Sequence, residues 1–152
     1  MRREDRSVTQ ESAVAILTGG HWGVLSLADE KGQPYGVPIS YAYEHGTIYI
    51  HCALDGRKLD CLRAQPRVSF CVVDRATTLP DRFSVDYASV IVSGDAIELT
   101  GDEKRQALSA LVAKYSPGFE SEGETYISRA IGKTRAFKIT IESITGKARN
   151  PA

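Results

Sequence analysis

The chain has 152 residues, of which 42% are hydrophobic and 25% charged, the composition of an ordinary globular domain. Its 19 Lys and Arg balance its 19 Asp and Glu, and this absence of a basic excess argues against a dedicated nucleic-acid-binding protein. No apolar run approaches the roughly 20 residues of a membrane span, and the charged N-terminus lacks the apolar segment of a signal peptide. We therefore expect one cytoplasmic domain over residues 1–152, with no membrane or nucleic-acid partner.

The first part of the chain predicts a helix followed by three strands. Ser7 and Gln10 are spaced as in a capping box, which predicts a helix from Val8 to Leu17 that the glycine pair 19–20 stops. The turns DEKG and EHG would join the next strands into an antiparallel meander. Pro38 in the second of them indicates an edge or a bulge. These strands are His21–Ala28, Tyr35–Tyr43 and Thr47–Cys52.

Three further strands follow, and they decide the fold class. Gly94 indicates a bend or bulge inside a long strand, whereas 74–83 is polar, contains a proline and predicts a loop. The tail from Glu142 is small and polar. Six strands without βαβ alternation predict a mainly β, antiparallel barrel or sandwich with flanking helices. The later strands are Arg67–Val73, Ser84–Leu99 and Thr134–Ile141.

Helices are expected beside these strands. One short helix should begin near Gly56 and run to about Arg63. Another, capped by Thr100 or Asp102, has an apolar stripe with a period of 3.6 residues, and Ser121 with Glu124 would cap a short helix running to about Ala130. The stripe consists of Ala107, Leu108, Leu111 and Val112.

The tripeptide Gly56-Arg57-Lys58 has two interpretations. A helix start offers unpaired backbone N–H groups and the positive end of the helix dipole, so two cations there could bind a phosphate. Alternatively, this is an exposed basic turn in which Asp55 caps the helix and uses its free N–H groups. The residues alone leave both interpretations open.

Strand alternation places His51 on the face away from the core. Residues 47, 49 and 51 would share one face, which could line a cleft, while Ile48, Ile50 and Cys52 would face the core. An imidazole in a cleft could meet an anion or a carbonyl, although a half-exposed strand histidine is the simpler interpretation. In the first strand, Trp22, Val24 and Leu27 are available for burial.

No motif of a self-sufficient active site or a metal site is present. The three cysteines lack CxxC spacing, and the three histidines lack ligand spacing, so we expect neither a disulfide framework nor a metal. The GxSxG elbow, the Rossmann glycine pattern and the P-loop are also missing. An enzyme built from this chain would need a cofactor to supply its chemistry.

The order of several motifs resembles the pyridoxamine phosphate oxidase-like FMN-binding split-barrel superfamily, and within it the nitroimidazole-resistance (Nim) branch. The resemblance extends over nearly the whole chain. It is carried by YGVPISY at 35–41, IYIHC at 48–52, Gly56-Arg57-Lys58 with Leu62, YASVIV at 87–92 with Gly94, and TGK at 145–147.

The resemblance implies a six-stranded antiparallel split barrel that forms a homodimer with FMN at the interface. Arg57 and Lys58 would hold the phosphate, and His51 would be the functional group near the flavin ring. Tyr87 and Ser89 would approach the flavin from the partner subunit. The implied cofactor-binding residues are Val37, Pro38, Ile39, Ser40, Tyr41, His51, Cys52, Gly56, Arg57, Lys58, Tyr87 and Ser89.

The implied activity is an FMN-dependent reductase that takes a hydride from NAD(P)H and reduces a small aromatic acceptor, such as a nitro compound or a quinone. Two alternatives share the fold: a flavin- or haem-binding carrier or sensor without turnover, and a deazaflavin-dependent reductase. The chain is short for a true pyridoxamine phosphate oxidase and lacks that enzyme's additional basic and aromatic residues, so oxidation of vitamin B6 is not expected.

Overall fold

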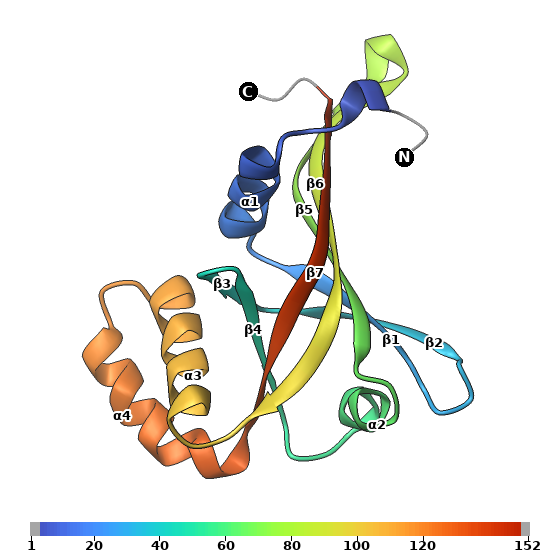
Figure 1. Ribbon diagram of the computed structural model, residues 1–152. Helices are drawn as coiled ribbons and strands as arrows, with labels where there is room; N and C mark the ends of the chain where they lie inside the picture. The colour runs from blue at the N-terminus through green and yellow to red at the C-terminus, as the bar shows by residue number, and fades with distance from the viewer. Residues whose placement is uncertain (1–3, 150–152) are drawn as a thin grey trace.

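The computed structural model describes residues 4–149, which form one antiparallel sheet flanked by helices (Figure 1). The sheet has seven strands in the order β2-β1-β5-β6-β7-β4-β3, one more than the sequence predicts. The strands are β1 (Gly23–Ala28), β2 (Pro34–Ile39), β3 (Ala42–Glu44), β4 (Thr47–Cys52), β5 (Arg67–Leu79), β6 (Ser84–Leu99) and β7 (Arg135–Arg149).

Four α-helices surround the sheet. The first, α1 (Gln10–Gly19), packs on β5, β6 and β7, whereas α3 (Gly101–Tyr115) and α4 (Glu120–Ala130) form a pair beside β3 and β4 (Figure 1). The short α2 (Arg57–Ala64) follows β4 and packs against β1. Three 3-10 turns cover Glu4–Arg6, Pro80–Arg82 and Ile131–Lys133. No helix of residues 4–149 is both long and apolar enough to cross a membrane.

The sheet closes on itself because one predicted strand is divided between its two edges. Instead of one strand over Tyr35–Tyr43, β2 forms one edge and β3 the other. Only Ser40 and Tyr41 separate them, and three Cα–Cα steps span at most about 11 Å. The edges must therefore lie close together, which gives a split barrel and makes the predicted three-strand meander wrong.

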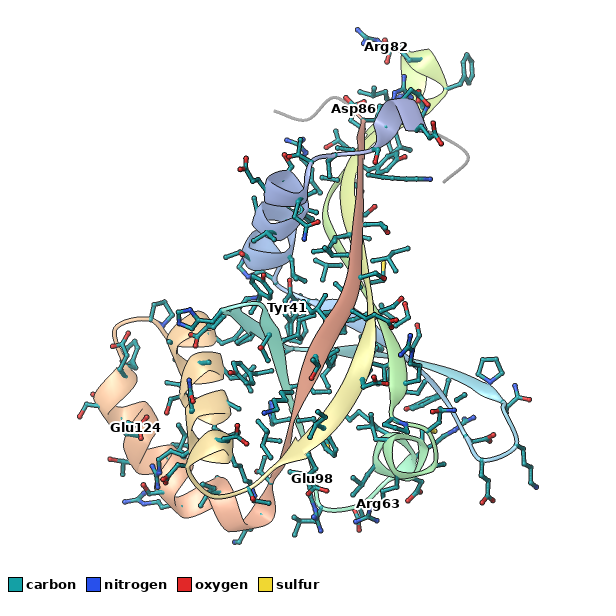
Figure 2. All side chains as sticks on the ribbon, viewed as in Figure 1. Tyr41, Arg63, Arg82, Asp86, Glu98 and Glu124 are labelled. Carbon is teal, nitrogen blue, oxygen red and sulfur yellow. The ribbon has the colours of Figure 1, made fainter. Side chains whose placement is uncertain are left out.

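The barrel core confirms the predicted alternation of β4, where Ile48 and Ile50 are buried, and the facing residues of β5, β6 and β7 are buried as well. In β1 the prediction is wrong for Val24, which is 42% exposed, because Leu25 and Leu27 form the buried face. Tyr41 is fully buried near the centre of the molecule, where its hydroxyl donates a hydrogen bond to the Leu17 carbonyl (2.6 Å; Figure 2). A second cluster joins α3 and α4 to β3 through Ala42, Leu108, Ala110, Leu111 and Ile127.

Two segments predicted to be irregular are strands. Residues 74–79 continue β5, in which 75–79 pair with 84–88 of β6, and the tail from Glu142 continues β7 to Arg149 along β6. Most side chains of 74–79 are exposed, so hydrophobic alternation gives no signal there and backbone hydrogen bonds hold the arm. The register shift between Ser93 and Gly94 confirms the predicted bulge.

The predicted N-caps of α1 and α4 are wrong. Thr9, not Ser7, accepts the capping hydrogen bond of α1, from the backbone N–H of Ser12 (3.2 Å). Ser7 forms a bridge with Lys147 of β7 instead, because the chain before α1 lies against the sheet. The fourth helix begins at Glu120, after Phe119, whose side chain provides no cap.

Candidate functional site

A hollow of about 500 Å³, called here the basic hollow, brings together half of the twelve predicted cofactor-binding residues. The end of β2 contributes two of them and Ser40 follows it directly, β4 contributes two, and Lys58 comes from the first turn of α2. Its lining residues are Trp22, Pro38, Ile39, Ser40, His51, Cys52, Ala53, Lys58, Lys133 and Thr134.

Strand pairing explains this assembly. His51 pairs with Ala136 and Cys52 with Arg135, so Thr134 and Lys133 come next to the end of β4. On the other side, pairing of Gly23 with Ile39 places Trp22 beside the end of β2. The sequence analysis missed Trp22, Lys133 and Thr134 as site residues because each is brought in by a strand partner distant in the sequence.

The start of α2 is not capped by a side chain. Gly56 occupies the N-cap position with φ 115°, a conformation that favours glycine, and no side chain within residues 4–149 caps the first turn. Asp55 is exposed and does not act as the cap. The two cations diverge: Lys58 lines the hollow, whereas the Arg57 guanidinium lies 4.5 Å from the centroid of the Tyr35 ring. The alternative in which Asp55 uses the free N–H groups is therefore not what the structure shows.

His51 stands in the wall of the basic hollow with a perturbed pKa. Although part of the residue is exposed, burial of the imidazole lowers its pKa, and the nearby Lys58 ammonium lowers it further. The imidazole is therefore neutral at neutral pH and can donate a hydrogen bond through one nitrogen and accept through the other. Burial also raises the pKa of the neighbouring Cys52 thiol.

The remaining predicted residues lie elsewhere in the chain. Val37 packs against the core, and the Tyr41 side chain is enclosed in it. Tyr87 and Ser89 lie on the distant half of β6: ten residues separate Ser89 from Leu99, which lies level with His51 across β7, or roughly 30 Å of strand. In Figure 2, Asp86 beside Tyr87 and Arg63 of α2 lie near opposite ends of the molecule.

A second cavity, of about 560 Å³, opens between α3, α4 and the same wall. We call it the apolar cavity, because Leu108, Leu111, Val112, Tyr115, Phe119, Tyr126, Ile127 and Ala130 form most of its lining. It shares Trp22, Ser40, His51 and Thr134 with the basic hollow. Trp22, which the sequence analysis expected to be available for burial, is 63% exposed and lies beside both spaces.

The outer face of the sheet carries an apolar row next to the basic hollow. Pro38, Val24, Cys71 and Ile91 are register partners across β2, β1, β5 and β6. Val24 is 42% and Ile91 50% exposed, and Val73 near them is 56% exposed. An exposed apolar row of this kind is typical of a surface that another protein covers.

Comparison with known proteins identifies relatives along the whole chain. A sequence model of the family described as pyridoxamine 5'-phosphate oxidase matches residues 9–148. An uncharacterized protein of Rhizobium meliloti (strain 1021) is 25% identical over 150 residues, which cover 94% of each chain.

Solved structures share the fold. A FAD-binding protein from Mesorhizobium loti is 26% identical, with a TM-score of 0.68 and 93% of each chain covered. A candidate 5-nitroimidazole antibiotic resistance protein from Bacteroides thetaiotaomicron VPI-5482 has a TM-score of 0.78 at 20% identity, covering 93% of this chain and 85% of its own. A FAD- and haem-binding protein from Mycobacterium smegmatis has a TM-score of 0.83 at 20% identity, covering 97% and 75%.

Proposed function

The chain belongs to the pyridoxamine 5'-phosphate oxidase family, and we propose that it binds FMN and transfers electrons from NAD(P)H to a small aromatic acceptor, a nitro compound or a quinone. The observation that carries the proposal is the basic hollow at the uncapped start of α2, which is lined by Lys58, Lys133 and His51. The relatives that bind FAD, or FAD and haem, support a flavin as the cofactor.

The residues of the hollow fit a phosphate-bearing flavin. Two lysine ammonium groups and free backbone N–H groups of α2 are the donors that a phosphate needs, and among the described residues no side chain caps that helix start. Pro38, Ile39 and Trp22 provide apolar surface for a ring system in the same space.

Purified protein should therefore be yellow, or should retain added FMN through desalting. A protein that stays colourless after FMN addition would contradict the proposal.

Bound flavin would supply the redox chemistry, accepting a hydride equivalent from NAD(P)H and passing two electrons to the acceptor. The protein would orient the cofactor and exclude water. Because its pKa is lowered, the His51 imidazole is neutral at neutral pH, so it can donate a hydrogen bond to the ring through one nitrogen or accept a proton at the other.

Replacing His51 by alanine is expected to lower the turnover number by about 10²-fold, the low end of general acid–base effects, and to change the FMN dissociation constant much less. The phosphate donors remain, so cofactor affinity should survive. Steady-state oxidation of NAD(P)H and an FMN titration measure the two quantities. His21→Ala is the control, because His21 is exposed and lines neither the hollow nor the cavity. Equal losses of FMN affinity and turnover in His51→Ala would remove the proposed role.

We also propose a homodimer in which the apolar row on the outer sheet face is covered by a second copy. The row ends at Pro38, which lines the basic hollow, so an interface there would adjoin the cofactor. Within one protomer, Tyr87 and Ser89 lie roughly 30 Å of strand from the His51 level. They could therefore reach a flavin only from the partner subunit.

Ile91→Glu is expected to convert the dimer to a monomer, because it places a carboxylate at the β6 end of the apolar row, where burial of an unpaired charge is costly. The matched control is Ile97→Glu on the same strand. Ile97 is 47% exposed, close to the 50% of Ile91. It pairs with Lys138 of β7 but has no partner on β5, which begins opposite Asp95, so it lies outside the apolar row. Light scattering gives the mass of each variant. A wild-type monomer, or a dimer that tolerates Ile91→Glu, would contradict this interface.

A carrier without turnover is the second candidate, favoured by the fold shared with the FAD- and haem-binding protein of M. smegmatis. A flavin-loaded protein that does not oxidise NADH or NADPH with added acceptors would support the carrier over the reductase.

A further inference from the structure

The apolar cavity between α3 and α4 has the size and lining of a small-molecule site. Its volume of about 560 Å³ falls in the range of roughly 300–1,000 Å³ typical of ligand pockets. Leu111 and Ile127 form its buried floor, whereas Phe119 and Tyr126 remain 62% and 70% exposed at its edge. Large aromatic side chains left exposed around an apolar space are the groups that would cover a flat apolar molecule.

The charged residues in the lining of the apolar cavity disfavour a negatively charged ligand. Among the described residues that line the cavity there is no Lys or Arg, and the only carboxylate is that of Glu122. The polar groups gather at the wall shared with the basic hollow, where Ser40, His51 and Thr134 provide hydroxyl and imidazole groups. A ligand would therefore be uncharged, with its apolar body between the helices and its polar atoms toward His51.

We infer that the apolar cavity receives an uncharged aromatic molecule, and that this molecule is the electron acceptor. The acceptor role rests on the proposed flavin chemistry, whereas binding itself requires only the cavity. The groups proposed to bind the phosphate, Lys58 and Lys133, line the basic hollow together with His51. The apolar cavity also reaches His51, from the side of α3 and α4. A quinone there would become a hydroquinone by taking two electrons and one proton that originate in the hydride of NAD(P)H, and a second proton from water.

Filling the cavity provides the test. Ala130 lies in the cavity lining but not in the basic hollow, so Ala130→Phe would occupy cavity space and leave the phosphate donors in place. The matched control is Ala113→Phe, because Ala113 is exposed on α3 and lines neither space. Melting temperatures would establish that both variants are folded.

The binding measurement uses the single tryptophan of the chain. Trp22 lines the cavity, so a bound nitroaromatic molecule should quench its fluorescence. Titrations with 4-nitrotoluene and with 4-nitrobenzoate compare two rings that differ mainly in charge, with N-acetyltryptophanamide as the reference for collisional quenching. We expect 4-nitrotoluene to bind at least tenfold more tightly than 4-nitrobenzoate, and Ala130→Phe to weaken it at least tenfold while Ala113→Phe has no effect.

The acceptor role is measured with duroquinone, whose substituted ring does not alkylate the nearby Cys52 thiol. Ala130→Phe should raise the duroquinone KM about tenfold and leave the FMN dissociation constant within twofold of wild type.

Three results would overturn the site. The first is tryptophan quenching in the wild-type protein that is no stronger than in N-acetyltryptophanamide, and the second is tighter binding of 4-nitrobenzoate than of 4-nitrotoluene. The third is a dimer in which the second copy closes the cavity. Ligand binding in a protein that refuses FMN would refute the proposed function and the acceptor role while leaving the cavity site standing. FMN-supported turnover with an unchanged KM in Ala130→Phe would overturn the acceptor role alone.

Discussion

Replacing Lys58 by alanine is expected to weaken FMN binding by about 10- to 100-fold. Lys58 lines the basic hollow next to the uncapped start of α2, where a phosphate would receive both its ammonium and backbone N–H groups. A hydrogen bond to a charged group contributes about 1.5–3 kcal/mol, and each 1.4 kcal/mol corresponds to tenfold in affinity. Fluorescence titration of the flavin, and its absorbance after desalting, measure the loss.

Two further substitutions sharpen the Lys58 experiment. Lys31→Ala is the matched control, because Lys31 is exposed in the turn between β1 and β2 and lines neither the hollow nor the cavity. Arg57→Ala should weaken FMN binding less than Lys58→Ala, since the Arg57 guanidinium lies over the Tyr35 ring rather than in the hollow. Unchanged FMN retention in Lys58→Ala would exclude this lysine from the phosphate site.

Gly94→Ala is expected to lower the free energy of unfolding by about 3 kcal/mol, the upper part of the usual range for an overpacked site. A Cβ at this position would lie 2.0 Å from the backbone oxygen of Thr140. That oxygen belongs to β7, which pairs with β6 on both sides of the bulge, so it cannot move without breaking the ladder. Denaturant unfolding measures the loss.

Gly132→Ala is the control for Gly94→Ala. A Cβ at Gly132 meets nothing within 4 Å, and its φ lies outside the left-handed region. The substitution should be neutral or stabilise the protein by up to about 1 kcal/mol through the entropy of the unfolded chain. Similar unfolding curves for the two variants would show that the bulge relaxes and that the close approach has no energetic weight.

The basic motif shows how far sequence reasoning reached at the site. Gly56-Arg57-Lys58 predicted a helix start with two cations, and the structure has α2 beginning at Arg57 after an uncapped Gly56. Local sequence could not separate the two cations, because the helix direction and the position of Tyr35 on β2 decide which one faces the hollow. Lys133 joins through the pairing of β4 with β7, a contact about 80 residues apart in the chain.

Trp22 illustrates the opposite error. Its strand position and apolar character made it a candidate for burial, yet it is 63% exposed. Hydrophobic residues are inside only on average, and a large exposed aromatic side chain often belongs to a binding surface. In β1 the buried residues are Gly23, Leu25 and Leu27, so the alternation places Trp22 on the outward face with Val24.

The sequence alone determined the class of the fold, the predominance of antiparallel strands, the bulge at Gly94 and the apolar stripe of α3, because hydrophobic periodicity and turn residues act locally. Tertiary structure decided that Tyr35–Tyr43 is divided between opposite edges, that 74–79 and 142–149 are strands, and which polar groups share a hollow. Those features depend on pairing between distant segments. Backbone hydrogen bonds between strands do not require particular side chains, so the segments that form them need not show a hydrophobic periodicity in the sequence.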